Sequence, residues 1–438
     1  MISAFAYRFI PSNGSRDTMS AKQKMYQQIY LFIAGCLLLG NYASRPGLAA
    51  EPWTQWRGPE RNGIASGASP PLTWSATENV RWKTPLPGSG ISSPILWKDR
   101  ILVTAAERER PNQLHLICLS RQDGSILWQR RFWGTAPTRF HSTKSSMASP
   151  TPITDGEFVY AYYGTGDVFC VDLEGRLQWQ RSLAGEYGRF ENRFSATSSP
   201  LLLNDLLILQ CDHYGPSYAI ALDKRTGQNI WKTARPKTWL SWSSPRLVPA
   251  QDGQELILCS SLKIDGLNPQ TGQLLWTIDG MRRECIPTPV FGHGLIYAVS
   301  GPKGPTLAIR PGGRGNVTES HVKWENQRGA PYVPSAILVG DYYYLVDDQG
   351  ISTCLDAHSG KRIWQKRLSG AYTASPIATD RSIYFTNEDG LTIVLAAHQE
   401  RYVERARNRI EESVYASPVI DNGQLLIRSN RHLWCISK

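Results

Sequence analysis

"LDKRTGQNIW" (residues 222–231) places a polar turn with a glycine directly before a strand that carries a tryptophan. The pattern returns four times, as "RQDGSILW" (121–128), "DLEGRLQW" (172–179), "NPQTGQLLW" (268–276) and "DAHSGKRIW" (356–364), and a degenerate copy without the glycine, "ESHVKW", covers 319–324. Glycine suits a hairpin turn that requires positive φ, and the polar residues around it supply the turn's hydrogen bonds. The repeated unit therefore contains a tight turn followed by an outer strand with one tryptophan.

A second phrase, Ser-Pro before an apolar run, opens each unit. Its proline, or Ser335 where the proline is displaced, stands at positions 94, 150, 200, 245, 289, 335, 376 and 418. The steps of 41 to 56 residues lie near the roughly 40–50-residue period of propeller blades. Apolar stretches between the landmarks, such as "LLLNDLLILQC" (201–211), indicate short antiparallel strands. Each unit thus amounts to about four strands.

These repeats predict an all-β fold, an eight-bladed β-propeller of four-stranded antiparallel blades. The last unit stops before a tryptophan strand, and "NVRWKTPL" (79–86) is a tryptophan strand with no unit before it, so together they complete one blade. Loss of the degenerate unit near 310–335 would give seven blades instead. The tryptophans expected to dock between blades are Trp82, Trp128, Trp179, Trp231, Trp276, Trp324 and Trp364. The blade that begins at 373 lacks one, and Tyr402 is the expected substitute.

Residues 1–50 lie outside the repeats and have the pattern of a secretory signal peptide. Basic residues precede the apolar run "IYLFIAGCLLLG" (29–40), and "GLAA" (47–50) supplies small residues for cleavage. "IAGC" (33–36) also matches a lipobox, which would leave Cys36 lipidated as a membrane anchor. The predicted organisation is a signal peptide (1–50), a lead-in segment (51–78) and a propeller (79–438), in a periplasmic or secreted monomer.

Charge and cysteine content limit the function classes. Residues 51–438 carry 43 Lys and Arg residues against 36 Asp and Glu, a moderate positive balance without the basic runs of a nucleic-acid-binding protein. Cys118, Cys170, Cys354 and Cys435 recur at one equivalent place per repeat, where they are expected to be buried thiols rather than disulfides. Cys211 and Cys259 are the one pair for which the sequence does not exclude a disulfide bond. The histidines lack the spacing of metal ligands, so no metal site is predicted.

The repeats resemble the pyrroloquinoline-quinone (PQQ) repeat family of tryptophan-docked propellers, over residues 80–438. The lead-in "PWTQWRGPERNGIASG" (52–67) is similar to the opening of exported, non-enzymatic members. The resemblance implies that the tryptophans are structural. It also implies kinship with the propeller lipoprotein of the outer-membrane β-barrel assembly machinery, a scaffold for protein partners.

The same resemblance implies an alternative function, a PQQ-dependent dehydrogenase of alcohols or sugars. Such enzymes hold PQQ with calcium on the channel axis, and the alcohol dehydrogenases add a disulfide between adjacent cysteines. This chain has no Cys-Cys pair and no calcium loop of the EF-hand type. We therefore expect no catalytic residue and no cofactor, with PQQ and calcium kept as the alternative. A carbohydrate-binding or hydrolytic propeller would need paired carboxylates, and the loops before the phrases contain few acids.

Residues just before each Ser-Pro phrase are expected to gather around one mouth of the central channel. These loops contain arginine and aromatic residues, which carry many binding hot spots. The predicted binding residues are Lys144, Arg193, Trp239, Trp242, Arg282, Arg283, Arg328, Tyr332 and Tyr372. The sequence therefore predicts a non-catalytic scaffold of the cell envelope that binds envelope proteins or an acidic, peptide-like ligand at this mouth, with no nucleic acid and no membrane contact except through the lipid anchor.

Overall fold

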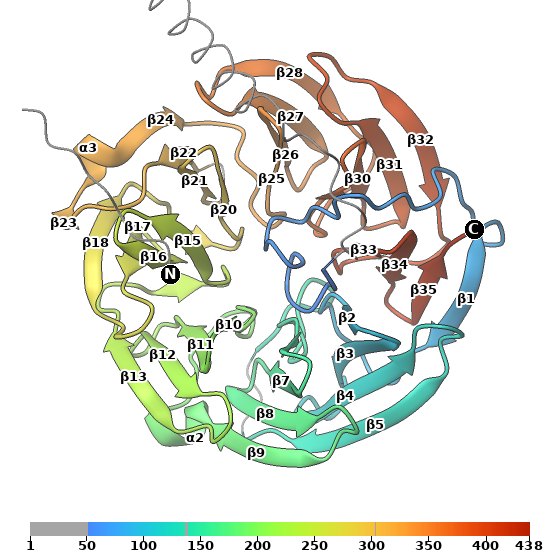
Figure 1. Ribbon diagram of the computed structural model, residues 1–438, viewed down its shortest axis with the longest axis horizontal. Helices are drawn as coiled ribbons and strands as arrows, with labels where there is room; N and C mark the ends of the chain where they lie inside the picture. The colour runs from blue at the N-terminus through green and yellow to red at the C-terminus, as the bar shows by residue number, and fades with distance from the viewer. Residues whose placement is uncertain (1–50, 136–138, 303) are drawn as a thin grey trace, which may run out of the picture. The chain divides into compact units, whose positions relative to one another are not determined.

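The computed structural model describes residues 51–135, 139–302 and 304–438. The predicted signal peptide and Cys36 therefore lie outside the described residues. Eight antiparallel sheets follow one another around a central axis, each contributing its innermost strand to the channel wall (Figure 1). The prediction of eight four-stranded blades is confirmed, and the seven-bladed alternative is wrong.

The first four complete blades are formed by consecutive strands, each blade running from the axis outward. Their strands are β2 (Ile95–Trp97), β3 (Arg100–Ala106), β4 (Gln113–Ser120) and β5 (Ile126–Trp133); β6 (Ile153–Thr154), β7 (Phe158–Tyr162), β8 (Asp167–Asp172) and β9 (Leu177–Ser182); β10 (Leu201–Leu203), β11 (Leu206–Cys211), β12 (Tyr218–Asp223) and β13 (Asn229–Ala234); and β15 (Arg246–Ala250), β16 (Gly253–Cys259), β17 (Lys263–Leu267) and β18 (Leu274–Asp279).

The next three blades follow the same order. Their strands are β20 (Val290–Gly292), β21 (Leu295–Val299), β22 (Thr306–Ile309) and β24 (Val322–Asn326); β25 (Ile337–Val339), β26 (Tyr342–Val346), β27 (Ile351–Asp356) and β28 (Arg362–Arg367); and β29 (Ile377–Ala378), β30 (Ser382–Thr386), β31 (Leu391–Ala396) and β32 (Glu404–Arg409). Short additional elements are α2 (Leu183–Tyr187), β14 (Leu240–Ser241), β19 (Glu284–Cys285), β23 (Gly315–Asn316) and α3 (Thr318–His321).

The eighth blade joins the two ends of the propeller. Its inner strands β33 (Val419–Asp421), β34 (Gln424–Arg428) and β35 (His432–Ile436) come from the C-terminus, and its outer strand β1 (Val80–Pro85) comes from the N-terminal side. Strand β1 pairs antiparallel with β35. Lys83 in β1 also forms an ion pair of 2.9 Å with Glu412, which His432 contacts at 2.9 Å. The closure predicted from the incomplete repeats is therefore present.

Glu412 makes this closure sensitive to acid. Burial raises the pKa of its carboxyl, but hydrogen bonds from Ser429, Lys83 and His432 outweigh burial and lower the pKa from 4.5 to about 2. A carboxyl with a lowered pKa stabilises the fold above its unfolded pKa, and this contribution is lost as pH falls through the folded value. We expect the free energy of unfolding to decrease between pH 4.5 and about 2, and Glu412→Gln to flatten this decrease.

Urea unfolding at pH about 6 and about 3 measures the effect. Glu411→Gln is the control, because this neighbouring side chain is exposed. An equal acid dependence in Glu412→Gln and the parent protein would contradict the assignment.

The repeated tryptophans join neighbouring blades. In six of them the indole Nε1–H donates to a backbone carbonyl of the next blade at 2.9–3.3 Å; the pairs are Trp82–Arg121, Trp128–Leu173, Trp179–Lys224, Trp231–Pro269, Trp324–Ala357 and Trp364–Gln399. In five of these six, all but Trp364, the ring lies against a turn glycine of the next blade; the glycines are Gly124, Gly175, Gly227, Gly272 and Gly360. A Cβ built on Gly272, for example, would be 2.5 Å from a ring atom of Trp231, and the φ of this glycine is +71°. The motif therefore needs glycine both for its φ and for the space.

Two blade junctions depart from this pattern. Trp276 donates instead to Glu255 of its own blade at 2.8 Å, and β23 pairs with β18 at the outer edge of that blade. In β32 the tryptophan position is Ala406, which is paired with Val394 as Trp364 is with Cys354. The suggestion that Tyr402 replaces the missing tryptophan is wrong, because Tyr402 packs edge-on against Trp364 of the preceding blade.

Trp74 of the lead-in segment fills the space beside Ala406. Its ring is buried in the apolar cluster against which Ala406 packs, and it stacks on Tyr384 with 6.4 Å between the ring centroids. Its backbone N–H donates to Asn408 in β32 at 2.9 Å. The lead-in segment thus supplies the aromatic ring that this blade lacks.

The cysteines of the described residues are all buried and unpaired. The open question of a Cys211–Cys259 disulfide is therefore answered, since both are free thiols. Cys118, Cys170, Cys354 and Cys435 each lie opposite a docking tryptophan on the adjacent strand, where a small side chain leaves room for the ring. Within the described ranges, no helix has the length and hydropathy of a membrane span.

Candidate functional site

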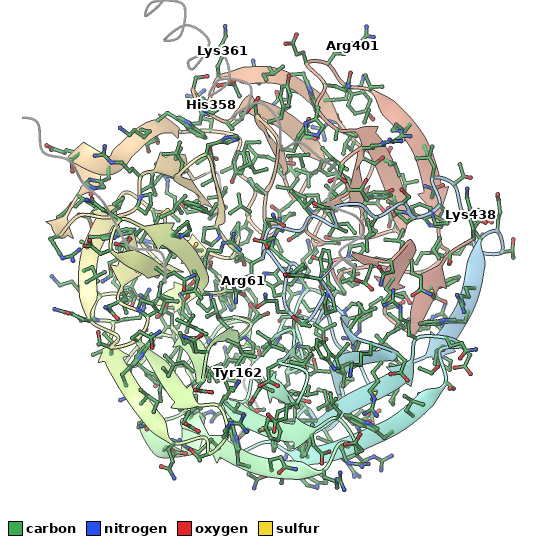
Figure 2. All side chains as sticks on the ribbon, viewed as in Figure 1. Arg61, Tyr162, His358, Lys361, Arg401 and Lys438 are labelled. Carbon is green, nitrogen blue, oxygen red and sulfur yellow. The ribbon has the colours of Figure 1, made fainter. Side chains whose placement is uncertain are left out.

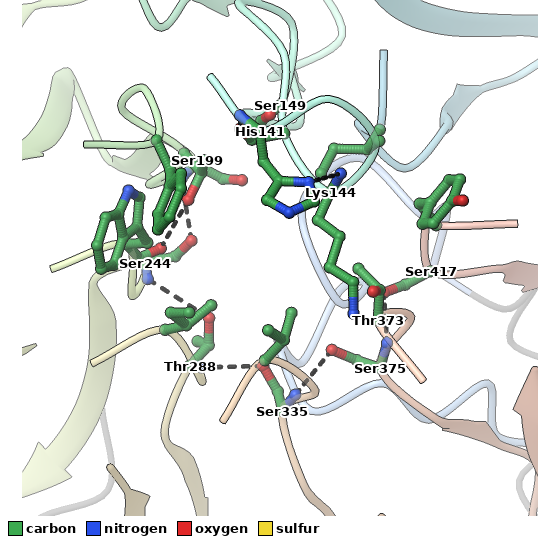
Figure 3. Close-up of a pocket in the computed structure, with 18 of the residues that line it drawn as sticks. His141, Lys144, Ser149, Ser199, Ser244, Thr288, Ser335, Thr373, Ser375 and Ser417 are labelled. Atoms are coloured by element: carbon green, nitrogen blue, oxygen red, sulfur yellow. Dashed lines mark hydrogen bonds between the residues drawn. The ribbon is translucent and has the colours of Figure 1, made fainter. Parts of the chain in front are cut away.

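The Ser-Pro phrases form a ring of hydroxyl residues around the propeller axis. From blade to blade, a backbone N–H donates to the hydroxyl oxygen of the next residue at 2.9–3.4 Å; the order is Ser93, Thr151, Ser199, Ser244, Thr288, Ser335, Ser375 and Ser417. The Ser93 hydroxyl closes the circle by donating to the Ser417 carbonyl at 2.9 Å. Figure 3 shows part of this ring. The repeated phrase is therefore structural, and it also lines the channel with hydroxyls.

The lead-in segment lies across one end of the channel. It contacts the inner strands of several blades, with Leu96 N–H donating to the Trp53 carbonyl at 2.8 Å and Arg57 donating to the Ala336 carbonyl at 2.7 Å. Arg61 lies near the centre of the propeller in Figure 2. The Trp56 indole donates to the hydroxyl of Thr288 in the ring at 3.0 Å. Trp56 therefore forms part of the wall of the axial cavity at this end.

The axial cavity has a volume of about 460 Å³. It is lined by the ring from Thr151 to Ser417, by Trp56, and by side chains from the loops that enter the inner strands. These loop side chains include His141, Lys144, Arg193, Phe194, Trp242, Tyr332 and Tyr415. A cavity of this size matches those that bind small ligands or the end of a peptide.

Two cations face the cavity with different partners. Lys144 forms an ion pair of 2.7 Å with Glu388, whose Oε1 also accepts the hydroxyl of Thr373 at 2.7 Å. Arg193 has no ion-pair partner within the described residues, and its guanidinium lies 5.0 Å from the centroid of the Phe194 ring. Phe194 in turn lies 6.0 Å from Trp242. The Arg193 charge is therefore presented on an aromatic surface and is not neutralised by a protein carboxylate.

One carboxylate, Asp348, also lines the cavity, and the backbone engages it. Its Oδ2 accepts the N–H groups of Tyr332 at 2.8 Å and Val333 at 3.3 Å. Burial raises the pKa of Asp348, against these two hydrogen bonds and the charge of Lys144. The Tyr332 hydroxyl donates to Glu284, and burial together with this hydrogen bond raises the pKa of Tyr332. These groups hold the loop shape rather than leaving an accessible acid and base pair.

The structure brings four of the predicted binding residues to the cavity wall, Lys144, Arg193, Trp242 and Tyr332. It does not bring the other five there. Arg282, Arg283 and Arg328 are exposed outside the cavity lining. Trp239 is 46% exposed, and Tyr372 is fully buried in an apolar cluster between blades.

Trp56 and Asp348 line the cavity but are not among the predicted binding residues. Asp348 follows the second strand of its blade, and such turns lie on the same face as the loops that enter the inner strands. The phrase "VDDQG" (346–350) therefore carried a usable signal. Trp56 precedes every repeat, so the period of the repeats does not predict its position in the cavity wall.

Comparisons with known proteins agree with this geometry. The family described as outer membrane protein assembly factor BamB matches residues 64–218, 188–366 and 319–438. BamB from Moraxella catarrhalis superposes with a TM-score of 0.58 at 17% identity, over 80% of this chain and 95% of that chain. Quinohemoprotein alcohol dehydrogenase from Comamonas testosteroni superposes with a TM-score of 0.63 at 12% identity, over 92% and 82%.

A europium-containing methanol dehydrogenase is similar to the same degree, with a TM-score of 0.62 at 11% identity, over 86% of this chain and 89% of that chain. Identities this low carry information on the fold alone. No match was found among curated proteins.

Proposed function

Because this chain belongs to the propeller family of outer membrane protein assembly factor BamB, we propose that it is a non-catalytic binding module of the cell envelope. Its axial cavity captures an acidic, peptide-like segment of an envelope protein. Export by the segment 1–50 is part of this proposal and rests on the apolar run 29–40.

The observation that carries the proposal is Arg193 at the cavity mouth. In the described part of the chain no carboxylate lies within ion-pair distance of it, and its guanidinium lies over Phe194. A planar guanidinium on an aromatic ring is suited to a carboxylate ligand, which it contacts through two parallel hydrogen bonds. The ring hydroxyls that line the cavity accept backbone N–H groups, and their O–H groups, unlike that of Ser93, are left to donate to such a ligand.

The surroundings of Arg193 favour an extended ligand over a compact ion. Arg193 also lines a second cavity of about 460 Å³, together with Arg139, Arg189 and Tyr214. The two cavities adjoin at Arg193, so one chain can place a carboxylate there and continue along either side. Exposed aromatic and arginine side chains are typical of surfaces that bind peptides.

The residues of the axial cavity do not fit a calcium-dependent quinoprotein. Calcium takes six to eight oxygen ligands, several of them carboxylates, and Asp348 is the only carboxylate among the residues that line the cavity. Of the described residues, the only cluster with three converging metal-type ligands lies elsewhere, on exposed turns. This comparison supports the binding module over the dehydrogenase.

Charge reversal at Arg193 tests the proposal. We expect Arg193→Glu to weaken binding of a fluorescein-labelled peptide of alternating glutamate and phenylalanine at least about tenfold, because it replaces the guanidinium that contacts the peptide carboxylate by a group of the same charge as that carboxylate. A factor of ten corresponds to about 1.4 kcal/mol. Fluorescence anisotropy with the full chain measures this.

Arg283→Glu is the matched control, since this arginine is exposed outside the cavity lining, and its effect should stay within about twofold. Equal affinity of Arg193→Glu and the parent protein would overturn the proposed site.

A separate titration with PQQ and Ca²⁺ follows the absorbance of the quinone and dye-linked oxidation of alcohols and sugars. Tight binding with turnover would replace the scaffold by the dehydrogenase.

A further inference from the structure

We propose that His293, Asp341 and His358 form a binding site for a divalent transition metal of the zinc type. His293 is in the turn between β20 and β21, Asp341 in the turn between β25 and β26, and His358 in the turn between β27 and β28. Turns between first and second strands and between third and fourth strands share the face opposite the loops that line the axial cavity. The site therefore lies away from the cavity mouth, and Figure 2 places His358 toward the rim.

The three side chains converge on one carboxylate oxygen. Asp341 Oδ1 lies 3.6 Å from Nε2 of His293 and 3.2 Å from Nε2 of His358. Zinc binds imidazole nitrogen and carboxylate oxygen at about 2.0–2.2 Å, so ligand atoms at the corners of its tetrahedron lie about 3.3 Å apart. Both separations lie within about 0.3 Å of this edge, and the possible ligand atoms of the three residues lie within 4.8 Å of one another. An ion at the centre needs only small side-chain rotations.

Asp341 contacts two imidazoles, those of His293 and His358, whereas a surface ion pair needs only one. One histidine would satisfy Asp341, yet the two rings come from different blades and stand 4.5 Å apart between centroids. Two neutral imidazoles and one carboxylate form a common zinc ligand set, with water in the fourth position. The side chains of His358 and Asp341 are 57% and 67% exposed, so an ion and its water have access.

In the metal-free protein the Nε2–H of His293 donates to the carbonyl of Gly340, the residue before Asp341, at 2.9 Å. A bound ion takes the place of this hydrogen bond. Metal binding requires Nε2 to lose this proton, and the ring then carries its proton on Nδ1 as the other neutral tautomer. A third imidazole, that of His398, packs against Gly340, since a Cβ built there would be 2.6 Å from its Nδ1. A bound ion would thus join two neighbouring blades at a turn rich in histidine.

Zinc binding by the full chain tests the site directly. Competition between the protein and a chromophoric zinc chelator is expected to give one strong site per chain. His293→Ala and His358→Ala should each weaken it at least about tenfold, because even loss of a group that only hydrogen-bonds to a metal ligand weakens binding about 10–100-fold. Asp341→Asn, which keeps the size and removes the charge, should also weaken it. Co²⁺ in the parent protein should give the intense visible absorption of a tetrahedral ion.

His321→Ala is the matched control, because His321 lies in α3 and outside this cluster. It should bind zinc as the parent does. His293, Asp341 and His358 lie in exposed turns, and melting curves recorded without metal check that every variant is folded. Unchanged affinity in the His293→Ala, His358→Ala double variant, or no zinc binding by the parent, would overturn the proposal.

Discussion

Trp231→Ala is expected to lower the free energy of unfolding by about 3–5 kcal/mol, the range for loss of a buried large aromatic side chain. Trp231 is 8% exposed and packs between its own blade and the next. Its indole N–H donates to the Pro269 carbonyl at 3.1 Å, and its ring covers Gly272. Truncation therefore leaves a cavity at a blade junction and an unpaired carbonyl. Urea unfolding followed by circular dichroism measures the loss.

Two variants separate the causes of this loss. Trp231→Phe keeps most of the apolar contact and removes the hydrogen bond, so it should cost about 1 kcal/mol beyond the small change in area. Trp133→Ala removes a tryptophan that is 64% exposed and should change stability by less than about 0.5 kcal/mol. If Trp231→Ala were no more destabilising than Trp133→Ala, the docking role would be refuted.

Arg235→Met is expected to destabilise the propeller by about 3–5 kcal/mol, because it removes one partner of a buried ion network. The Arg235 guanidinium donates to Asp212 at 2.9 Å and to Asp265 of the next blade at 2.9 Å, and all three side chains are at most 2% exposed. Burial lowers the pKa of Arg235, but the two carboxylates outweigh burial and raise it. Without the arginine, Asp212 is a buried anion with no ion-pair partner among the residues that the structure describes.

The matched control is a surface ion pair of the same residue types. Arg225 lies 3.2 Å from Glu157, and both side chains are more than half exposed, so Arg225→Met should cost less than about 1 kcal/mol. Adding Asp212→Asn to Arg235→Met removes the uncompensated charge and should restore part of the lost stability. Melting temperatures are compared for the parent, the single variants Arg235→Met, Asp212→Asn and Arg225→Met, and the double variant. Additive effects of Arg235→Met and Asp212→Asn would show that charge is not the cause.

Most of the fold was predictable because its rules are local and repeat. A turn glycine followed by a tryptophan marks most outer strands, and a Ser-Pro phrase or a close variant of it marks each inner one, so counting the phrases counts the blades. Exceptions arose where a distant segment replaces a local one. Strand β32 has Ala406 at the position of the docking tryptophan. Trp74, more than 300 residues earlier in the chain, fills the space beside it.

The cavity was predictable only in part. Residues that immediately precede an inner strand lie near the axis, which is why Lys144, Arg193, Trp242 and Tyr332 were found. Arg282 and Arg283 are in such a loop as well, yet they are exposed and do not line the cavity, since the direction of a loop side chain depends on packing that no repeat specifies. Whether any of these residues binds a ligand is the subject of the Arg193 experiment.

The sequence by itself determined the repeat, the number of blades and the closure by a strand from the N-terminal side, since these follow from hydrogen bonding and burial that each unit needs on its own. Tertiary structure alone decided which groups meet across blades. The lead-in segment crosses the channel beneath eight hydroxyls, and His293, Asp341 and His358 converge from turns that are 48 and 17 residues apart along the chain. The curvature of a closed propeller brings such turns together, and no spacing in the sequence encodes that distance.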